Sequence, residues 1–74
     1  MEKVLYTSPM FNQVFLVPVD AVKTYKKRDA ALLALKDLGG VQAPNTEQVR
    51  KLRQTMLNAR RKIEREGWGC VLAY

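Results

Sequence analysis

The sequence predicts a small α+β domain in which two or three short antiparallel strands pack on two helices, or on three if the middle region divides. The expected order is ββα(α)αβ. Short segments rich in β-branched and aromatic residues stand near both ends of the chain, and two long stretches of helix-forming residues lie between them. A chain of 74 residues with 47% apolar side chains is typical of one small hydrophobic core. We therefore expect a single domain over residues 1–74, without linker or internal repeat.

The first two strands are expected at residues 4–8 and 13–17, which read VLYTS and QVFLV. Both segments are rich in β-branched and aromatic side chains. The segment PMFN at 9–12 contains the Pro and Asn that are common in turns. The two strands are therefore compatible with a hairpin.

Helix-forming residues fill positions 21–38, after Pro18 ends the second strand and Asp20 offers a cap. The apolar positions of this region are Ala21, Tyr25, Leu32 and Leu35. They share one stripe of a single helix only if Arg28 lies on that stripe as well. Two short helices, the second capped by Asp29, are therefore favoured over one.

A loop is predicted at residues 39–45, GGVQAPN. Gly39 tolerates a positive φ and so ends the preceding helix, and Pro44 keeps the chain extended. Asn45 is the expected N-cap of the last helix, with Gln48 three residues later completing a capping box.

The last helix is expected to stop at Gly67 and to be followed by a strand. The closing segment at 68–74, WGCVLAY, alternates large and small side chains. This period of two is typical of a strand with one buried face. We expect it to pair with an N-terminal strand.

Composition argues against catalysis. The chain has no histidine and a single cysteine, Cys70, so it offers neither an internal disulfide nor a zinc ligand set. Glu64 and Glu66 point to different sides of a helix, and Cys70 lacks a base. Gly39-Gly40 is not followed by the Gly-Lys-Ser/Thr of a phosphate loop. We therefore expect no enzyme activity, no metal and no cofactor.

The sequence predicts a cytoplasmic protein without membrane attachment. Its longest apolar run, VFLVPV at 14–19, is interrupted by Pro18 and is much shorter than the roughly 20 residues that span a bilayer. No extended apolar segment of the kind found in signal peptides follows the N-terminus.

Residues 49–66 combine five regularly spaced apolar side chains with seven Arg or Lys residues. The apolar ones fall within about 80° on a helical wheel and so form the face that packs on the core. They are Val49, Leu52, Met56, Ala59 and Ile63. The remaining surface is cationic and amide-bearing. Its candidate binding residues are Arg50, Lys51, Arg53, Gln54, Asn58, Arg60, Arg61, Lys62 and Arg65.

The chain carries a net charge of +6, and residues 45–67 hold seven basic and three acidic side chains, which is net +4. Guanidinium groups pair with phosphate oxygens and amides bond to base edges, so this helix favours nucleic acid or an acidic protein surface. The alternative is an ordinary solvated face containing a Lys62–Glu66 ion pair. In the segment KTYKKR at 23–28, Tyr25 could stack on a base, but we favour an ordinary solvated surface with a half-buried tyrosine.

Some apolar residues are candidates for docking on a protein partner. Leu57 falls beside the buried stripe and is flanked by arginines, a setting that fits an anchor residue. The N-terminal segment MEKVLYTSPMF is also apolar enough to dock. The candidate docking residues are Leu5, Tyr6, Met10, Phe11 and Leu57.

LLALKDLGG at 32–40, ARRKIEREGW at 59–68 and the terminal strand resemble, over about residues 29–74, the winged-helix DNA-binding domains of bacterial response regulators. This resemblance implies DNA binding, with a middle helix inside residues 45–54 and Trp68 closing the core. Its implied phosphate or base contacts are Arg53, Arg60, Arg61 and Arg65.

In size and character the chain also resembles small phage-encoded proteins that bind host RNA polymerase, which implies polymerase as a partner in the host cytoplasm. The function that we expect is non-enzymatic regulation of transcription through the basic helix. The alternatives are direct attachment to RNA polymerase that alters initiation or termination, and inhibition of another host enzyme.

Overall fold

The N-terminal hairpin forms where the sequence predicts it. The computed structural model describes residues 2–73, with β1 at Lys3–Ser8 and β2 at Gln13–Pro18. In the turn between them, the Asn12 backbone N–H donates to the Ser8 carbonyl at 2.8 Å. Asn12 adopts φ 52°, a left-handed conformation that asparagine tolerates better than most residues. The predicted PMFN turn is thus confirmed.

The sheet has one covered and one open face. β3 at Val71–Leu72 pairs antiparallel with β2, which gives the strand order β1-β2-β3. Cross-strand partners share a face, so Tyr6 and Phe15 lie on the side that packs on the helices. Leu5, Leu16 and Val71 form a row across the opposite side.

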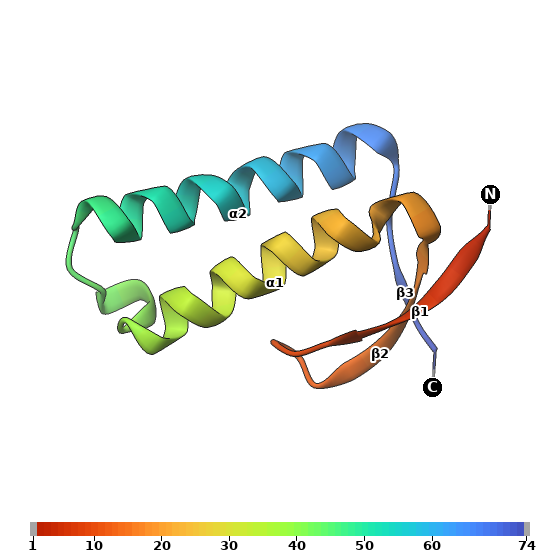
Figure 1. The fold of residues 1–74 in the computed structure, drawn as a ribbon, viewed down its shortest axis with the longest axis horizontal. Helices are drawn as coiled ribbons and strands as arrows, with labels where there is room; N and C mark the ends of the chain where they lie inside the picture. The colour runs from red at the N-terminus through yellow and green to blue at the C-terminus, as the bar shows by residue number, and fades with distance from the viewer. Residues whose placement is uncertain (1, 74) are drawn as a thin grey trace.

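Two helices complete the fold, and the predicted α+β order is confirmed as ββααβ. α1 at Val22–Asp37 and α2 at Glu47–Glu66 lie side by side as an antiparallel pair, and the sheet packs near the end where α1 begins and α2 stops (Figure 1). Short 3-10 turns precede and follow α1, η1 at Val19–Ala21 and η2 at Gly40–Gln42. None of the helices within residues 2–73 is both long and apolar enough to cross a membrane.

The predicted division of the first helical region is wrong, because α1 is a single helix. Asp29 does not cap a second helix; it is fully buried. Arg28 does lie on the buried side, with its side chain 18% exposed, which is the condition that a single helix required. Its charge is compensated there by Asp29, 2.9 Å away, and by the Tyr25 ring, 4.8 Å below the guanidinium carbon. Asp20 lies in η1 and makes no side-chain cap.

α2 begins one residue later than predicted. Its N-cap is Thr46, whose Oγ1 accepts a hydrogen bond from the Val49 N–H at 3.2 Å. The Thr46 N–H donates to the Pro44 carbonyl at 2.8 Å, and this tight turn places Thr46 rather than Asn45 at the capping position. The predicted capping box of Asn45 with Gln48 is therefore wrong.

This cap assignment predicts unequal effects of two neighbouring substitutions. Thr46→Ala removes the acceptor for an otherwise unpaired N–H and is expected to lower the free energy of unfolding by about 1 kcal/mol. Asn45→Ala, the matched control, is expected to change it by less than about 0.5 kcal/mol, as exposed substitutions do. Urea denaturation of both variants measures the difference. Equal losses of unfolding free energy in the two variants would contradict the assignment of Thr46 as the N-cap.

The hydrophobic core lies where the sheet meets the start of α1 and the end of α2. Its buried members are Tyr6, Val17, Ala21 and Tyr25. Trp68 and Cys70 pack against this cluster, as the predicted alternation required. Leu72, the next large residue of that alternation, is 55% exposed, so its predicted burial is wrong, and the strand itself is only two residues long. The last residue of the predicted strand, Tyr74, and the first of the predicted docking segment, Met1, lie outside the described residues.

Candidate nucleic-acid interface on helix α2

The rotation of α2 about its axis is fixed by its apolar stripe. Val49 and Ala59 are buried, and the three other predicted core residues of the helix are partly buried. Those three are Leu52, Met56 and Ile63. Because this stripe faces α1, and Ile63 at its end packs against the core cluster, the opposite side of the 20-residue helix faces solvent. The predicted buried face is confirmed.

Three arginines form the outermost line of the helix, which we name the basic crest: Arg50, Arg61 and Arg65. They are exposed and lie within about 60° of one another on the helical wheel. Gln54 and Asn58 lie along the same line and are joined by an amide hydrogen bond of 2.8 Å. From Arg50 to Arg65 the crest extends about 22 Å at 1.5 Å per residue.

The chain's own acids neutralise little of this charge. Lys51 pairs with Glu47 at 3.4 Å and Arg65 with Glu66 at 3.6 Å. Glu66 is 44% exposed, and the other three side chains are more than 70% exposed. Pairs of this kind contribute little and are screened by salt. Within residues 2–73, no ion pair within 4 Å involves Arg50, Arg53, Arg60 or Arg61.

The Lys62–Glu66 ion pair expected for an ordinary solvated helix face does not form among the described residues. Glu66 lies beside Arg65, and the Lys62 ammonium is 5.7 Å from the centre of the Trp68 ring. On this flank of α2, Lys62 shares a polar depression of about 250 Å³ with Lys27 of α1. Thr24, Thr55, Asn58 and Ala59 complete its lining.

This depression joins two basic clusters that are far apart in the sequence. Lys27 belongs to the KTYKKR segment, for which the sequence favoured an ordinary solvated surface. Tyr25 of that segment is 2% exposed and is not available for stacking on a base. The sequence does not reveal that Lys27 and Lys62 line one depression, because only the packing of α1 on α2 brings them to it.

The other flank of α2 carries Arg53 and Arg60, about 20° apart on the wheel. Arg53 is partly buried beside an apolar groove, whereas Arg60 is exposed. The nine predicted binding residues therefore form a crest with two flanks and do not make one uniform surface.

The predicted docking residues separate in the structure. Met10 and Leu57 line the same groove, and Phe11 is half exposed in the hairpin turn. Leu5 lies on the open face of the sheet. Tyr6 as a docking residue is wrong: its ring is buried in the core and its hydroxyl donates to Asp29.

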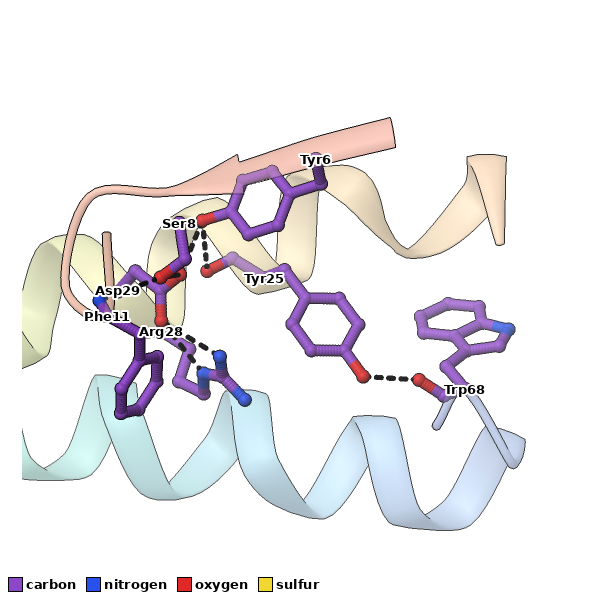
Figure 2. Close-up of polar contacts among 7 residues, drawn as sticks. All are labelled: Tyr6, Ser8, Phe11, Tyr25, Arg28, Asp29 and Trp68. Atoms are coloured by element: carbon purple, nitrogen blue, oxygen red, sulfur yellow. Dashed lines mark hydrogen bonds and ion pairs between the residues drawn. The ribbon is translucent and has the colours of Figure 1, made fainter. Parts of the chain in front are cut away.

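One dense cluster of polar side chains lies away from α2 and holds the hairpin to α1. Asp29 Oδ2 accepts hydrogen bonds from the hydroxyls of Tyr6 and Ser8, and Asp29 Oδ1 accepts from the Arg28 guanidinium at 3.0 Å (Figure 2). Asp29 and Ser8 are fully buried, so no substrate reaches them. We therefore assign this cluster to stability.

Burial controls the ionisation of the two core tyrosines. It raises the pKa of Tyr6 well above its ordinary value, and the hydrogen bond to Asp29 raises it further. Burial likewise raises the pKa of Tyr25 to about 12, with a smaller contribution from the Cys70 thiol. The Tyr25 hydroxyl donates to the Trp68 carbonyl and thus ties the end of α2 to α1.

Within residues 2–73, no three His, Cys, Asp or Glu side chains lie close enough together to hold a metal ion.

α2 runs unbroken from Glu47 to Glu66, so a separate middle helix of the winged-helix kind is not formed there. Comparison of the chain with protein-family models, with curated proteins and with solved structures gave no match.

Proposed function

We propose that this protein is a non-enzymatic regulator of transcription that binds nucleic acid through helix α2. One observation carries the proposal: the crest arginines face solvent with at most a weak exposed ion pair to the chain's own acids. A face whose cations were paired internally would have little charge left for a partner. Here the charge is concentrated on one side of α2 and exposed.

The geometry of the crest suits a phosphate backbone. The major groove of duplex DNA admits an α-helix, and arginines along such a helix bond to phosphate oxygens on either side. Gln54 and Asn58 lie among those arginines. Side-chain amides in such a position can hydrogen-bond to base edges in the groove. Lys27 and Lys62 extend the basic surface over one flank towards α1.

The proposal predicts that Arg50→Gln, Arg61→Gln and Arg65→Gln together weaken binding to a short duplex DNA at least about tenfold in low salt. Binding releases counterions, so the slope of log affinity against log salt falls by about 0.9 for each phosphate that is no longer neutralised, or by up to about 2.7 in all. Fluorescence anisotropy over a KCl series measures both quantities. Matched single-stranded DNA and RNA show which nucleic acid is preferred.

A charge-matched variant separates the crest from net charge. Lys3→Gln, Lys23→Gln and Lys26→Gln remove the same amount of charge from positions on β1 and α1, away from the crest. This control is expected to reduce affinity much less than the crest variant. Equal losses, or unchanged binding by a folded crest variant, would exclude the crest as the binding surface.

Pull-down from a cell extract, with and without nuclease, tests the alternative of direct attachment to RNA polymerase. If the protein acts through nucleic acid, recovery of polymerase falls after nuclease treatment. Recovery that survives nuclease and does not depend on the crest arginines would contradict the proposal and favour direct attachment.

A further inference from the structure

An apolar groove opens between the helices, at the end where α1 is linked to α2. It has a volume of about 600 Å³, open to solvent on one side. The lining comes from three parts of the chain: the hairpin turn, α1 with η2, and α2. Its apolar side chains are Met10, Leu32, Leu35, Val41, Met56 and Leu57.

Apolar surface continues from the groove onto its edges. Val41 is 97% exposed and Leu57 is 37% exposed, although both are large aliphatic residues. Leu38, in the link between α1 and η2, is also exposed. A small ligand inside the groove would leave these edges in water, whereas a polypeptide lying across it would cover them. The extent of the surface therefore favours a macromolecular partner.

Cations border this apolar surface. Lys36 and Arg53 line the groove itself, on α1 and α2 respectively. Arg60 and Arg61 lie one helical turn beyond Leu57 and Arg53 lies one turn before it, so arginines surround the exposed leucine. None of these four cations has an ion pair within 4 Å inside residues 2–73.

We propose that this groove binds an acidic amphipathic helix of a partner protein. Apolar side chains one helical turn apart would enter the groove, and flanking carboxylates would pair with the cations at its edge. A second copy of this chain is a poor occupant, because its net charge of +6 would bring like charges together around Lys36 and Arg53. Both described ends of the chain lie at the opposite end of the molecule (Figure 1).

The test is selection from a phage-displayed library of random peptides about 16 residues long, enough for about four helical turns. The bait is the full chain, with counter-selection against the Val41→Gln, Leu57→Gln double variant. We expect enriched peptides to be acidic, with apolar residues spaced i, i+3 or i+4, and i+7. A selected peptide should bind the double variant at least about tenfold more weakly, which corresponds to about 1.4 kcal/mol.

Two further variants locate the site. Leu5→Gln with Val71→Gln makes the same chemical change on the open face of the sheet, where both side chains are more than half exposed. It should leave peptide binding unchanged. Lys36→Glu with Arg53→Glu should abolish binding of acidic peptides and favour basic ones. Circular dichroism checks that each variant is folded.

The proposal fails if enriched peptides are neutral or basic, or if they bind the Val41→Gln, Leu57→Gln variant as tightly as the parent chain. It also fails if nothing is enriched over that variant. Sedimentation equilibrium showing a dimer that this variant dissociates would identify a second copy as the occupant instead. The two glutamines leave net charge unchanged, so nucleic-acid binding should persist, and the two proposals can fail separately.

Discussion

Replacing Asp29 by alanine is expected to lower the free energy of unfolding by about 3–5 kcal/mol, the usual cost of breaking a buried ion pair from one side. A chain of 74 residues has a total stability of roughly 4–11 kcal/mol at 0.05–0.15 kcal/mol per residue. The single substitution therefore removes a large part of the stability and leaves a substantial unfolded fraction at 37 °C.

The size of this effect follows from the buried polar groups that lose their partner when Asp29 is replaced. Arg28 would keep its charge with only 18% of its side chain exposed and without its carboxylate partner. The hydroxyl of Ser8 would lose its acceptor at 2.9 Å, in a position without access to water. The Tyr6 hydroxyl would keep only its longer hydrogen bond, 3.4 Å from the Tyr25 carbonyl. Each orphaned group adds a desolvation penalty.

Urea denaturation of Asp29→Ala, beside Asp37→Ala as a matched control, measures this loss. Asp37 is exposed at the end of α1, so its replacement should change stability by less than about 0.5 kcal/mol. Arg28→Gln alone and combined with Asp29→Ala completes a double-mutant cycle, for which we expect a coupling of about 1–3 kcal/mol. Loss below about 1 kcal/mol for Asp29→Ala would show that the cluster is not what holds the hairpin to α1.

The same cluster marks the limit of sequence-based prediction for this fold. Residue composition located both strands of the hairpin, and glycines located the loop at Gly39 and the end of α2 at Gly67, because those signals are local. Helical periodicity favoured a broken first helix, because Arg28 interrupts the apolar stripe. What allows Arg28 to lie there is Asp29, held by hydroxyls from the hairpin that are distant in sequence. A pattern within one helix contains no information about that compensation.

For the candidate sites, sequence and structure contribute different parts. The buried stripe of α2 was predictable, and with it the outward direction of the basic crest, since both follow from one helical period. The groove was not predictable as a site, because it depends on Met10, Val41 and Leu57 meeting from three separate segments. Leu57 alone was identifiable, from its place beside the stripe among arginines.

Loss of stability at alkaline pH is the second large effect that we expect, because two tyrosines are buried in the core. Tyr25 is 2% exposed and Tyr6 is 5% exposed, and both must stay neutral to remain buried. Their folded pKa values lie above the value of about 10 of an unfolded chain. The stability that they contribute is therefore complete below pH 10 and is lost as the pH rises through the folded pKa, about 12 for Tyr25 and higher for Tyr6.

Tyr25 alone is expected to contribute about 3 kcal/mol to this loss, at about 1.4 kcal/mol for each pKa unit. Urea midpoints measured between pH 8 and pH 12 should begin to fall from about pH 10. Tyrosinate absorbance should rise together with the loss of helical circular dichroism, because ionisation and unfolding are linked.

Tyr25→Phe separates the ionisation from the hydrogen bond. It leaves the Trp68 carbonyl without its donor, so stability at pH 8 should fall by about 1–2 kcal/mol. Because phenylalanine does not ionise, the decrease above pH 10 should be shallower than in the parent chain. An alkaline branch as steep in Tyr25→Phe as in the parent would show that ionisation of Tyr25 does not limit stability at high pH.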